Sequence, residues 1–278
     1  MKNFIDCNWL NSHLEDAHLF VVDCRFDLFD PSYGKKAYSK GHIKDAYYLD
    51  INEDLSGPQK RHGGARPMPD IPELVKKLES LGITTDATIV FYDDTIISSS
   101  RAWWQFKYLG FKNVYILNGG FQTWKQLDLP TTTDVPAPRT QGKIEVTLQQ
   151  PIYLTMADVK QALQQSDTIL VDAREEQRYT GEYEPLYAQK GHIPTALNVP
   201  CDINITADGQ LADHPTLEKN FSHIEKSHDV ISYCGSGING ALNFAILDEL
   251  GYKVSLYVGS VSDWITYEEN CLSTGFEK

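Results

Sequence analysis

The sequence predicts an α/β fold in two similar halves, each a mainly parallel sheet flanked by helices. Short apolar runs alternate with amphipathic stretches, sequence blocks recur in the same order, and a segment rich in Thr and Pro separates the two sets. Alternation of strands and helices is typical of parallel sheets, because a helix usually makes the crossover between parallel strands.

The repeated blocks define the two halves. Each half contains an Asp-x-Arg motif, a Gly-His-Ile motif, a strand-to-helix segment and a block ending in Trp, in that order. A repeat of this size indicates a duplicated domain rather than one turn of a solenoid. The matched segments are 21–51 with 170–201, 90–111 with 231–252, and 119–124 with 259–264.

The join between the halves is visible in the composition. Residues 128–143, "DLPTTTDVPAPRTQGK", have no hydrophobic periodicity, which is typical of an extended linker. We therefore expect a non-catalytic domain at 1–130, a linker at 131–146 and a catalytic domain at 147–278. Each domain then has an ordinary size.

The expected strands and helices follow the hydrophobic pattern. Runs of β-branched and aromatic residues predict strands, and apolar residues at helical spacing predict helices. A helix over 71–82 ends at Gly82, a residue suited to the left-handed conformation that follows many helices. The predicted strands are 88–92, 113–117, 168–172, 229–233 and 254–258, and a second helix is predicted at 156–166.

Composition narrows the class of protein. The net charge of −13 argues against a nucleic-acid partner, since phosphate contacts need clustered Lys and Arg. No long apolar run is present, and the first residues are polar where a signal peptide would be apolar. We expect a cytoplasmic protein without a membrane segment.

The five cysteines do not form a recognisable framework. Their number is odd and no pair has C-x-x-C spacing, so neither a zinc site nor a disulfide scaffold is indicated. We expect no metal and no cofactor.

One cysteine, Cys234, stands out by its surroundings in "YCGSGINGALNF" (233–244). It follows a predicted strand and precedes a predicted helix, where α/β proteins commonly bind ligands. Gly235, Gly237 and Gly240 allow successive N–H groups to face an anion, and the helix start adds positive potential. Such a loop favours a thiolate, or an anion carried on its sulfur.

Two other interpretations compete for this loop. A buried cysteine beside a turn is common, but three closely spaced glycines need a further reason. A cysteine phosphatase would carry Cys-x5-Arg, with the arginine clamping the phosphate. Gly240 stands at that position, so a smaller transferred group such as sulfur fits better, and a thiolate nucleophile can hold it as a persulfide.

The chain resembles the two-domain rhodanese-type sulfurtransferases, the family of thiosulfate and 3-mercaptopyruvate sulfurtransferases. The resemblance covers nearly the whole chain and rests on "VVDCR", "GHI" and "LNGGFQTW" in the first half. In the second half it rests on "VDAREEQRY", "GHIPTALNVP", "YCGSG" and "VGSVSDW". It implies two rhodanese-like domains with catalysis only in the second.

The resemblance also implies roles for individual residues. It assigns catalysis to Cys234 and an anion of the substrate to Arg178. A proton relay of Ser236, Asp50 and His62 is a weaker implication, because Arg66 occupies the place of the relay histidine. The implied substrate-binding loop is Gly235, Ser236, Gly237, Ile238, Asn239 and Gly240.

Several positions depart from the family pattern or need a structural interpretation. Asn239 stands where a hydroxyl is usual, and its amide could bond the persulfide instead. Neutral Gly235 and Ser236 after the cysteine resemble the mercaptopyruvate type and leave the donor open. The repeated Gly-His-Ile histidines, and Arg174 of Asp-x-Arg, favour structural roles. Glu175, Glu176, Glu182 and Glu184 are expected on the solvated surface.

The first half lacks the nucleophile, since Asp93 aligns with Cys234. A carboxylate cannot carry a sulfane sulfur, so catalysis is expected in the second half alone. The predicted function is transfer of sulfur from 3-mercaptopyruvate or thiosulfate to cyanide or a thiol, including a protein thiol. The alternative is a low-turnover persulfide carrier that delivers sulfur to a protein partner, and a phosphatase is a distant third.

Overall fold

The structure, a computed structural model, describes residues 1–277 and divides into two compact units. The first unit comprises residues 1–57, 68–149 and 206–211. The second comprises 58–67, 150–205 and the chain from 212 onward. The predicted domain boundaries near 130 and 147 stay a prediction, and the contacts add two short segments that cross between the sequence halves.

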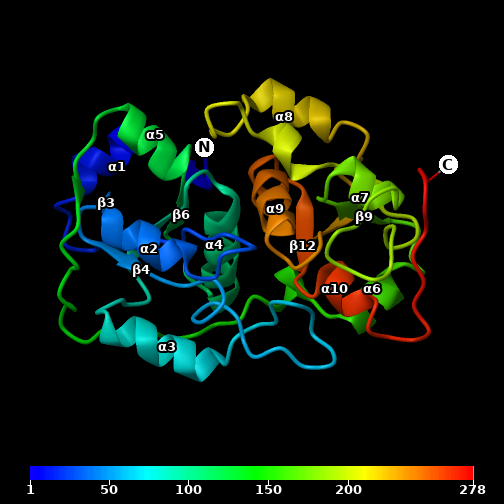
Figure 1. The fold of residues 1–278 in the computed structure, drawn as a ribbon, viewed down its shortest axis with the longest axis horizontal. Helices are drawn as coiled ribbons and strands as arrows, with labels where there is room; N and C mark the ends of the chain where they lie inside the picture. The colour runs from blue at the N-terminus through cyan, green and yellow to red at the C-terminus, as the bar shows by residue number, and fades with distance from the viewer. Residues whose placement is uncertain (278) are drawn as a thin grey trace. The chain divides into compact units, whose positions relative to one another are not determined.

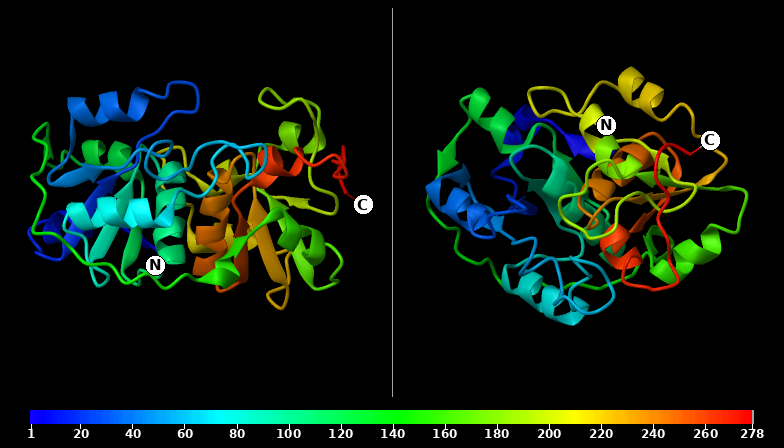
Figure 2. Two further views of the ribbon diagram at one scale, coloured as in Figure 1. Left: turned by 90° about the horizontal axis from the view of Figure 1, so that it is seen from below. Right: turned by 45° about the vertical axis from the view of Figure 1, so that its right-hand side comes forward.

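The first unit contains a five-stranded parallel sheet in the order β1-β6-β5-β2-β4. Its helices lie on the faces of this sheet (Figures 1 and 2). In chain order the elements are β1 (Phe4–Ile5), α1 (Cys7–His13), β2 (Leu19–Asp23), α2 (Tyr33–Lys40), β3 (His42–Ile43), β4 (Ala46–Tyr48), α3 (Ile71–Ser80), β5 (Thr88–Tyr92), α4 (Ile97–Leu109), β6 (Val114–Leu117), α5 (Gly120–Gln126) and β7 (Thr131–Thr132).

The second unit repeats this topology, with a parallel sheet in the order β8-β12-β11-β9-β10. The duplication read from the sequence is therefore a duplication of fold. The elements are η1 (Gln150–Ile152), β8 (Tyr153–Leu154), α6 (Met156–Ala162), β9 (Thr168–Asp172), α7 (Glu176–Thr180), β10 (Leu197–Asn198), η2 (Cys201–Asn204), α8 (His214–Asn220), β11 (Asp229–Tyr233), α9 (Asn239–Glu249), β12 (Lys253–Tyr257) and α10 (Ser260–Trp264).

The strand predictions are confirmed. The central strands β5, β9 and β11 have the predicted bounds, and β6 and β12 differ from the prediction by one residue at one or both ends. Helix α3 ends at Ser80, and Gly82 follows with φ of +94° as expected after a helix. Asp70 caps α3, since its side chain accepts a hydrogen bond from the Glu73 N–H.

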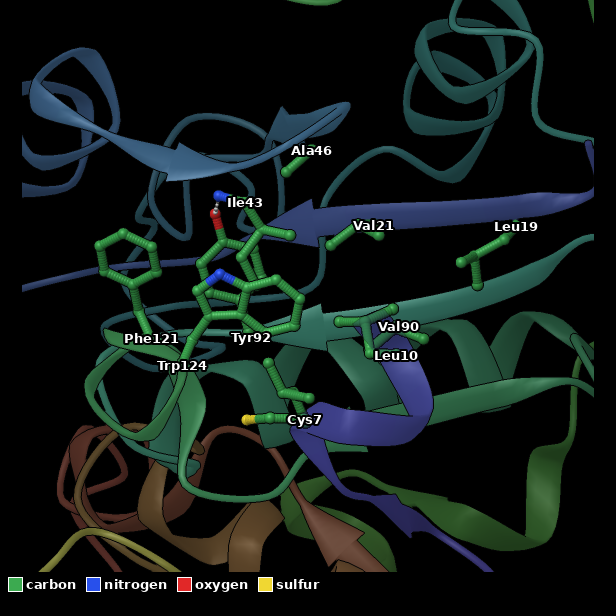
Figure 3. Packing of buried hydrophobic residues seen from close by; sticks show 11 residues of the cluster. Cys7, Leu10, Leu19, Val21, Ile43, Ala46, Val90, Tyr92, Phe121 and Trp124 are labelled. Carbon is green, nitrogen blue, oxygen red and sulfur yellow. Dashed lines mark hydrogen bonds between the residues drawn. The ribbon is translucent and has the colours of Figure 1, made fainter. Parts of the chain in front are cut away.

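Each unit has its own apolar core beneath its sheet. In the first unit, α1, β2, β5 and α5 contribute the cluster drawn in Figure 3, which includes Val21, Val90 and Trp124. Figure 3 also shows the Tyr92 hydroxyl accepting a hydrogen bond from the Ile43 N–H at 3.2 Å. In the second unit the Tyr233 hydroxyl accepts the Ile193 N–H at 3.1 Å, so the buried polar contact is duplicated with the fold.

The segment 131–146 packs on the first unit. Strand β7 pairs with β3, the Arg139 N–H donates to the Leu81 carbonyl, and the Gly142 N–H donates to the Glu79 carbonyl. These backbone bonds fix a segment whose sequence carries no periodicity. Across residues 1–277, no helix has both the length and the apolar character needed to cross a membrane.

Candidate active site

Cys234 lies directly after β11, at the carboxyl end of a central strand of the second unit. Residues 235–238 then lead into α9, which packs beside β12 (Figure 1). The start of an eleven-residue helix presents N–H groups and positive potential to this loop. The cysteine is 2% exposed, so its sulfur is largely removed from bulk water.

The sulfur of Cys234 has a directed backbone donor. The Gly237 N–H donates to Sγ at 3.1 Å, as expected of a loop whose amides turn inward. Ser260 lies on the other side, with its Oγ 4.0 Å from Sγ, and it accepts the Cys234 N–H at 3.1 Å. These contacts hold the thiol and direct a donor at it, the arrangement that stabilises negative charge on sulfur.

Gly237 and Gly240 are each required to be glycine, for different structural reasons. Gly237 has φ of +79°, and a Cβ there would lie 2.5 Å from the Val258 carbonyl oxygen. A side chain would therefore displace the N–H that reaches the sulfur. A Cβ on Gly240 would lie 3.0 Å from the Tyr233 backbone, so Gly240 permits α9 to approach β11.

Ser236 contacts an arginine from the segment 58–67. Arg66 Nη1 donates to the Ser236 Oγ at 3.0 Å. Arg66 is 9% exposed, and burial lowers the pKa of its guanidinium, while Tyr187 and Cys234 act in the opposite direction. A cation is thus held within the electrostatic range of the candidate nucleophile.

Arg178 also lies beside the loop. A Cβ on Gly235 would lie 3.3 Å from Arg178 Nη2 and 3.1 Å from the Tyr187 hydroxyl. Arg178 forms a paired interaction with Glu184, with Nε 3.0 Å from Oε2 and Nη2 2.9 Å from Oε1. The predicted anion-binding arginine is therefore engaged by a carboxylate of its own chain.

The expectation that Glu184 is a solvated surface residue is wrong. Its side chain is fully buried, and it also accepts Arg174 Nη1 at 3.2 Å. A carboxylate removed from water needs such partners, and two arginines supply them. Glu175, Glu176 and Glu182 are exposed as expected.

The remaining loop residues point into the protein. Ile238 is buried at the start of α9. Asn239 Nδ2 donates to Cys201 Sγ at 3.1 Å, so its amide is hydrogen-bonded to a second cysteine. Burial strongly raises the pKa of the Cys201 thiol, which keeps that thiol protonated.

The loop after β5 of the first unit has the same backbone design. The Asp93 carboxylate accepts N–H groups of Thr95, Ser98 and Ser99, and it also accepts the Ser98 hydroxyl at 2.5 Å. The protein's own carboxylate thus occupies the position that Cys234 has in the second unit.

Comparison with known proteins explains this duplicated frame. Residues 6–127 and 155–267 each match the rhodanese-like domain family. The chain belongs to the rhodanese-type sulfurtransferase family. Both units have the rhodanese fold, and the family relationship spans almost every element described above.

Relatives cover most of this chain. It is 36% identical to a probable 3-mercaptopyruvate sulfurtransferase of Pseudomonas aeruginosa, over 96% of either chain. It is 32% identical to SseB of Mycobacterium tuberculosis, a putative thiosulfate sulfurtransferase, over 88% of this chain and 87% of the relative. The crystal structure of SseA from Escherichia coli, a 3-mercaptopyruvate sulfotransferase, matches with a TM-score of 0.82 at 26% identity, covering 94% of this chain and all of SseA.

The three residues of the predicted relay have separate partners. Ser236 contacts Arg66, and His62 Nδ1 bonds to Thr266 Oγ1 at 2.7 Å while its ring stacks on Tyr267. Asp50 belongs to the first unit, where its carboxylate accepts the Tyr48 hydroxyl and nearby N–H groups. The relay stays a prediction.

The structural interpretation of the repeated histidines fits their contacts. His42 and His192 are fully buried, and each Nδ1 contacts a backbone carbonyl at 2.8 Å, that of Tyr38 and that of Tyr179. Each imidazole also stacks on the same tyrosine with centroids 3.8 Å apart. In the first unit this contact joins α2 to β3, and in the second it joins α7 to the segment that bridges to Ser273.

Sequence reasoning gave no role to three residues around Cys234. Ser260 lies in the quoted "VGSVSDW" block, whose recurrence was the available signal. Tyr187 and Glu184 lie in the variable stretch before Gly-His-Ile, where no local pattern distinguishes a site residue from a surface residue. Only the tertiary fold brings them to the loop.

Proposed function

We propose that this rhodanese transfers a sulfane sulfur from 3-mercaptopyruvate or thiosulfate to a thiophilic acceptor through a persulfide on Cys234. The observation that carries the proposal is the Gly237 N–H directed at Cys234 Sγ beneath the start of α9. A directed N–H donor stabilises negative charge on this sulfur, including that of a persulfide anion.

In the loading step, the Cys234 thiolate attacks the outer sulfur of the donor. With thiosulfate the S–S bond breaks, its electron pair leaves with sulfite, and the enzyme retains a persulfide anion. With mercaptopyruvate the C–S bond breaks and its electron pair leaves on the pyruvate enolate, which takes up the thiol proton. Neither reaction needs an external oxidant or a cofactor.

In the discharge step, an acceptor attacks the terminal sulfur of the persulfide. Cyanide takes that sulfur and leaves as thiocyanate, while the S–S electron pair returns to Cys234 as a thiolate. A thiol acceptor takes the sulfur in the same way and becomes a persulfide. The nucleophile is thus regenerated, and the kinetics follow a ping-pong order.

The loop residues have distinct parts in this proposal. Backbone N–H groups of 235–240 stabilise the sulfur anion, in the manner of an oxyanion hole. Arg178 presents its guanidinium beside Gly235 as a hydrogen-bond donor to the substrate anion, and Ser236 contacts the donor. A relay of Ser236, His62 and Asp50 is proposed only for the proton of mercaptopyruvate, since thiosulfate carries none.

The protein acts on small donors and acceptors, and we include protein thiols among the acceptors. We place it in the cytoplasm, because its five cysteines are all unpaired and the loading chemistry needs a reduced thiol.

The test is Cys234→Ser assayed with both donors and cyanide. We expect thiocyanate formation to fall by at least about 10⁴-fold, because the hydroxyl is a far weaker nucleophile and leaving group. The wild-type protein treated with donor alone should gain the mass of one sulfur atom, and Cys234→Ser should not.

Two outcomes would separate the alternatives. Stoichiometric loading of wild type with negligible turnover on small acceptors would indicate the persulfide carrier instead. Undiminished transfer by Cys234→Ser would refute both. Hydrolysis of an aryl phosphate that is lost in the same variant would revive the phosphatase.

A further inference from the structure

Arg178 stands in a cluster whose charges cancel. Arg174 and Arg178 contact Glu184, and Arg174 also forms a buried ion pair with Asp172, with Nη2 2.6 Å from Oδ2. Two cations and two carboxylates leave no net charge in this group. An incoming anion would have to compete with the Glu184 carboxylate for the Arg178 guanidinium, which Glu184 already binds through both of its oxygens.

A different cation faces the loop. Arg66 comes from the segment 58–67, and its guanidinium reaches the Ser236 hydroxyl, two residues beyond the nucleophile. The same guanidinium interacts electrostatically with Cys234 and Tyr187. Because Arg66 is 9% exposed, its charge is screened far less than that of a surface arginine.

Tyr187 completes this side of the loop. Its hydroxyl lies in the space above Gly235, and burial raises the pKa of the phenol, so that it stays a neutral donor. The Arg66 guanidinium and the Ser236 hydroxyl are thus in contact, and the Tyr187 hydroxyl lies beside Gly235, the residue that follows Cys234. All three can donate hydrogen bonds to oxygens of an anion.

We propose that Arg66, with Ser236 and Tyr187, supplies the positive charge that binds the anionic group of the sulfur donor next to Arg178, whose own charge is balanced by Glu184. The group bound is the carboxylate of mercaptopyruvate or the sulfonate oxygens of thiosulfate. A planar guanidinium suits both, because paired oxygens match its N–H fork. This inference rests on the proposed function and adds the residue that determines use of anionic donors.

The chemistry of Arg66 suits this assignment. A guanidinium stays protonated and does not exchange protons near neutral pH, so it keeps a fixed charge for a bound anion.

The experiment separates loading from discharge in single-turnover assays. Arg66→Gln, Arg66→Lys and wild type are loaded with mercaptopyruvate and, separately, with thiosulfate. Each protein is also loaded to completion, freed of donor, and discharged with dithiothreitol, which has neither a carboxylate nor a sulfonate group. The matched control is Arg61→Gln, since Arg61 lies in the same segment but is 74% exposed and 3.6 Å from Glu268.

For Arg66→Gln we expect the second-order rate constant of loading to fall about 10- to 100-fold with either donor. A fall of this size corresponds to the loss of one hydrogen bond between charged groups. The loading rate constant of Arg66→Lys should fall about 10-fold, because lysine keeps the positive charge but lacks the paired N–H donors of the guanidinium. Discharge should stay within about 2-fold of wild type in all variants, and Arg61→Gln should load within about 2-fold of wild type.

Loading of Arg66→Gln that equals that of Arg61→Gln would overturn the proposal. A parallel fall in loading and discharge would also overturn it, since that result indicates a structural role. If Arg66→Gln does not fold, as judged by circular dichroism, Arg66→Lys and Tyr187→Phe carry the same test. Failure of the proposed function has a different signature, namely that wild type itself gains no sulfur on Cys234.

Discussion

The loops after β5 and β11 are built alike and differ in the group that they hold. In the first unit, N–H groups of Thr95, Ser98 and Ser99 donate to the Asp93 carboxylate. In the second unit, the Gly237 N–H donates to Cys234 Sγ. Both loops lie at the end of a parallel strand and direct N–H groups at one side chain. The exchange of aspartate for cysteine at this position separates the first loop from the loop to which we assign catalysis.

The frames beneath the two loops are nearly identical. Arg25 binds Asp23 with Nη2 2.6 Å from Oδ2 and donates to the Gly41 carbonyl at 2.7 Å. Arg174 binds Asp172 and the Gly191 carbonyl at the same two distances. Duplication has preserved the parts that hold the fold, which supports a structural role for Arg174.

The largest effect that we expect concerns this shared frame. Arg25→Met and Arg174→Met should each lower the free energy of unfolding by about 3–5 kcal/mol, because each leaves a buried aspartate without its cation. Denaturant titration measures the loss. Arg25→Met should keep its sulfur transfer per folded molecule, and loss of that activity would show that the first unit does more than support the fold.

The next prediction concerns the pH dependence of the stability that Asp93 gives to the first unit. Burial raises the pKa of Asp93 to about 6, although bonds from Ser98 and Ser99 act to lower it. The folded protein therefore binds the proton of Asp93 more tightly than the unfolded chain does. The stability gained from this proton is present below pH 4 and is lost as the pH rises through 6. The stability of wild type relative to Asp93→Asn should fall by up to about 3 kcal/mol between pH 4 and pH 7.

Equilibrium unfolding of wild type and Asp93→Asn at several pH values checks this prediction. A difference in stability that does not change between pH 4 and pH 7 would contradict it. A difference that grows with pH would mean that the N–H bonds outweigh burial at Asp93.

The smallest effect concerns the backbone of the catalytic loop. Gly237→Ala should lower kcat/KM by about 100-fold, since the methyl group would meet the Val258 carbonyl and move the N–H away from Cys234 Sγ. Gly251→Ala is the control, because Gly251 has φ of +82° but open space around its Cβ position. It should cost about 1 kcal/mol of stability and no activity. Equal losses of activity in both variants would refute a specific role for the Gly237 N–H.

The fold was predictable from local patterns of apolar and polar residues, because the same patterns occur in both halves of the chain. The strands at 88–92, 168–172 and 229–233 are short segments rich in β-branched and apolar residues that lie in parallel sheets, and such segments are recognisable from the sequence alone. The loop around Cys234 was predictable for the same reason, since its glycines and its strand are neighbours in sequence.

The partners of the loop were less predictable because they come from distant segments. Glu184 was expected at the surface, but the fold buries it between Arg174 and Arg178. The contact of the Asn239 amide with Cys201 was not predicted either, because Cys201 lies 38 residues away in the sequence. Arg66 lies 170 residues from its contact Ser236, and no local spacing encodes that distance.

The path of residues 58–67 has a consequence for how the two halves can evolve. Although this segment belongs to the first half of the sequence, its contacts place it in the second unit. Residues 206–211 belong to the second half of the sequence, and their contacts place them in the first unit. A break in 131–146 would therefore not yield two self-sufficient proteins, because each half would lose a piece to the other. Each half of the sequence therefore contributes a short segment to the unit that is formed mainly by the other half.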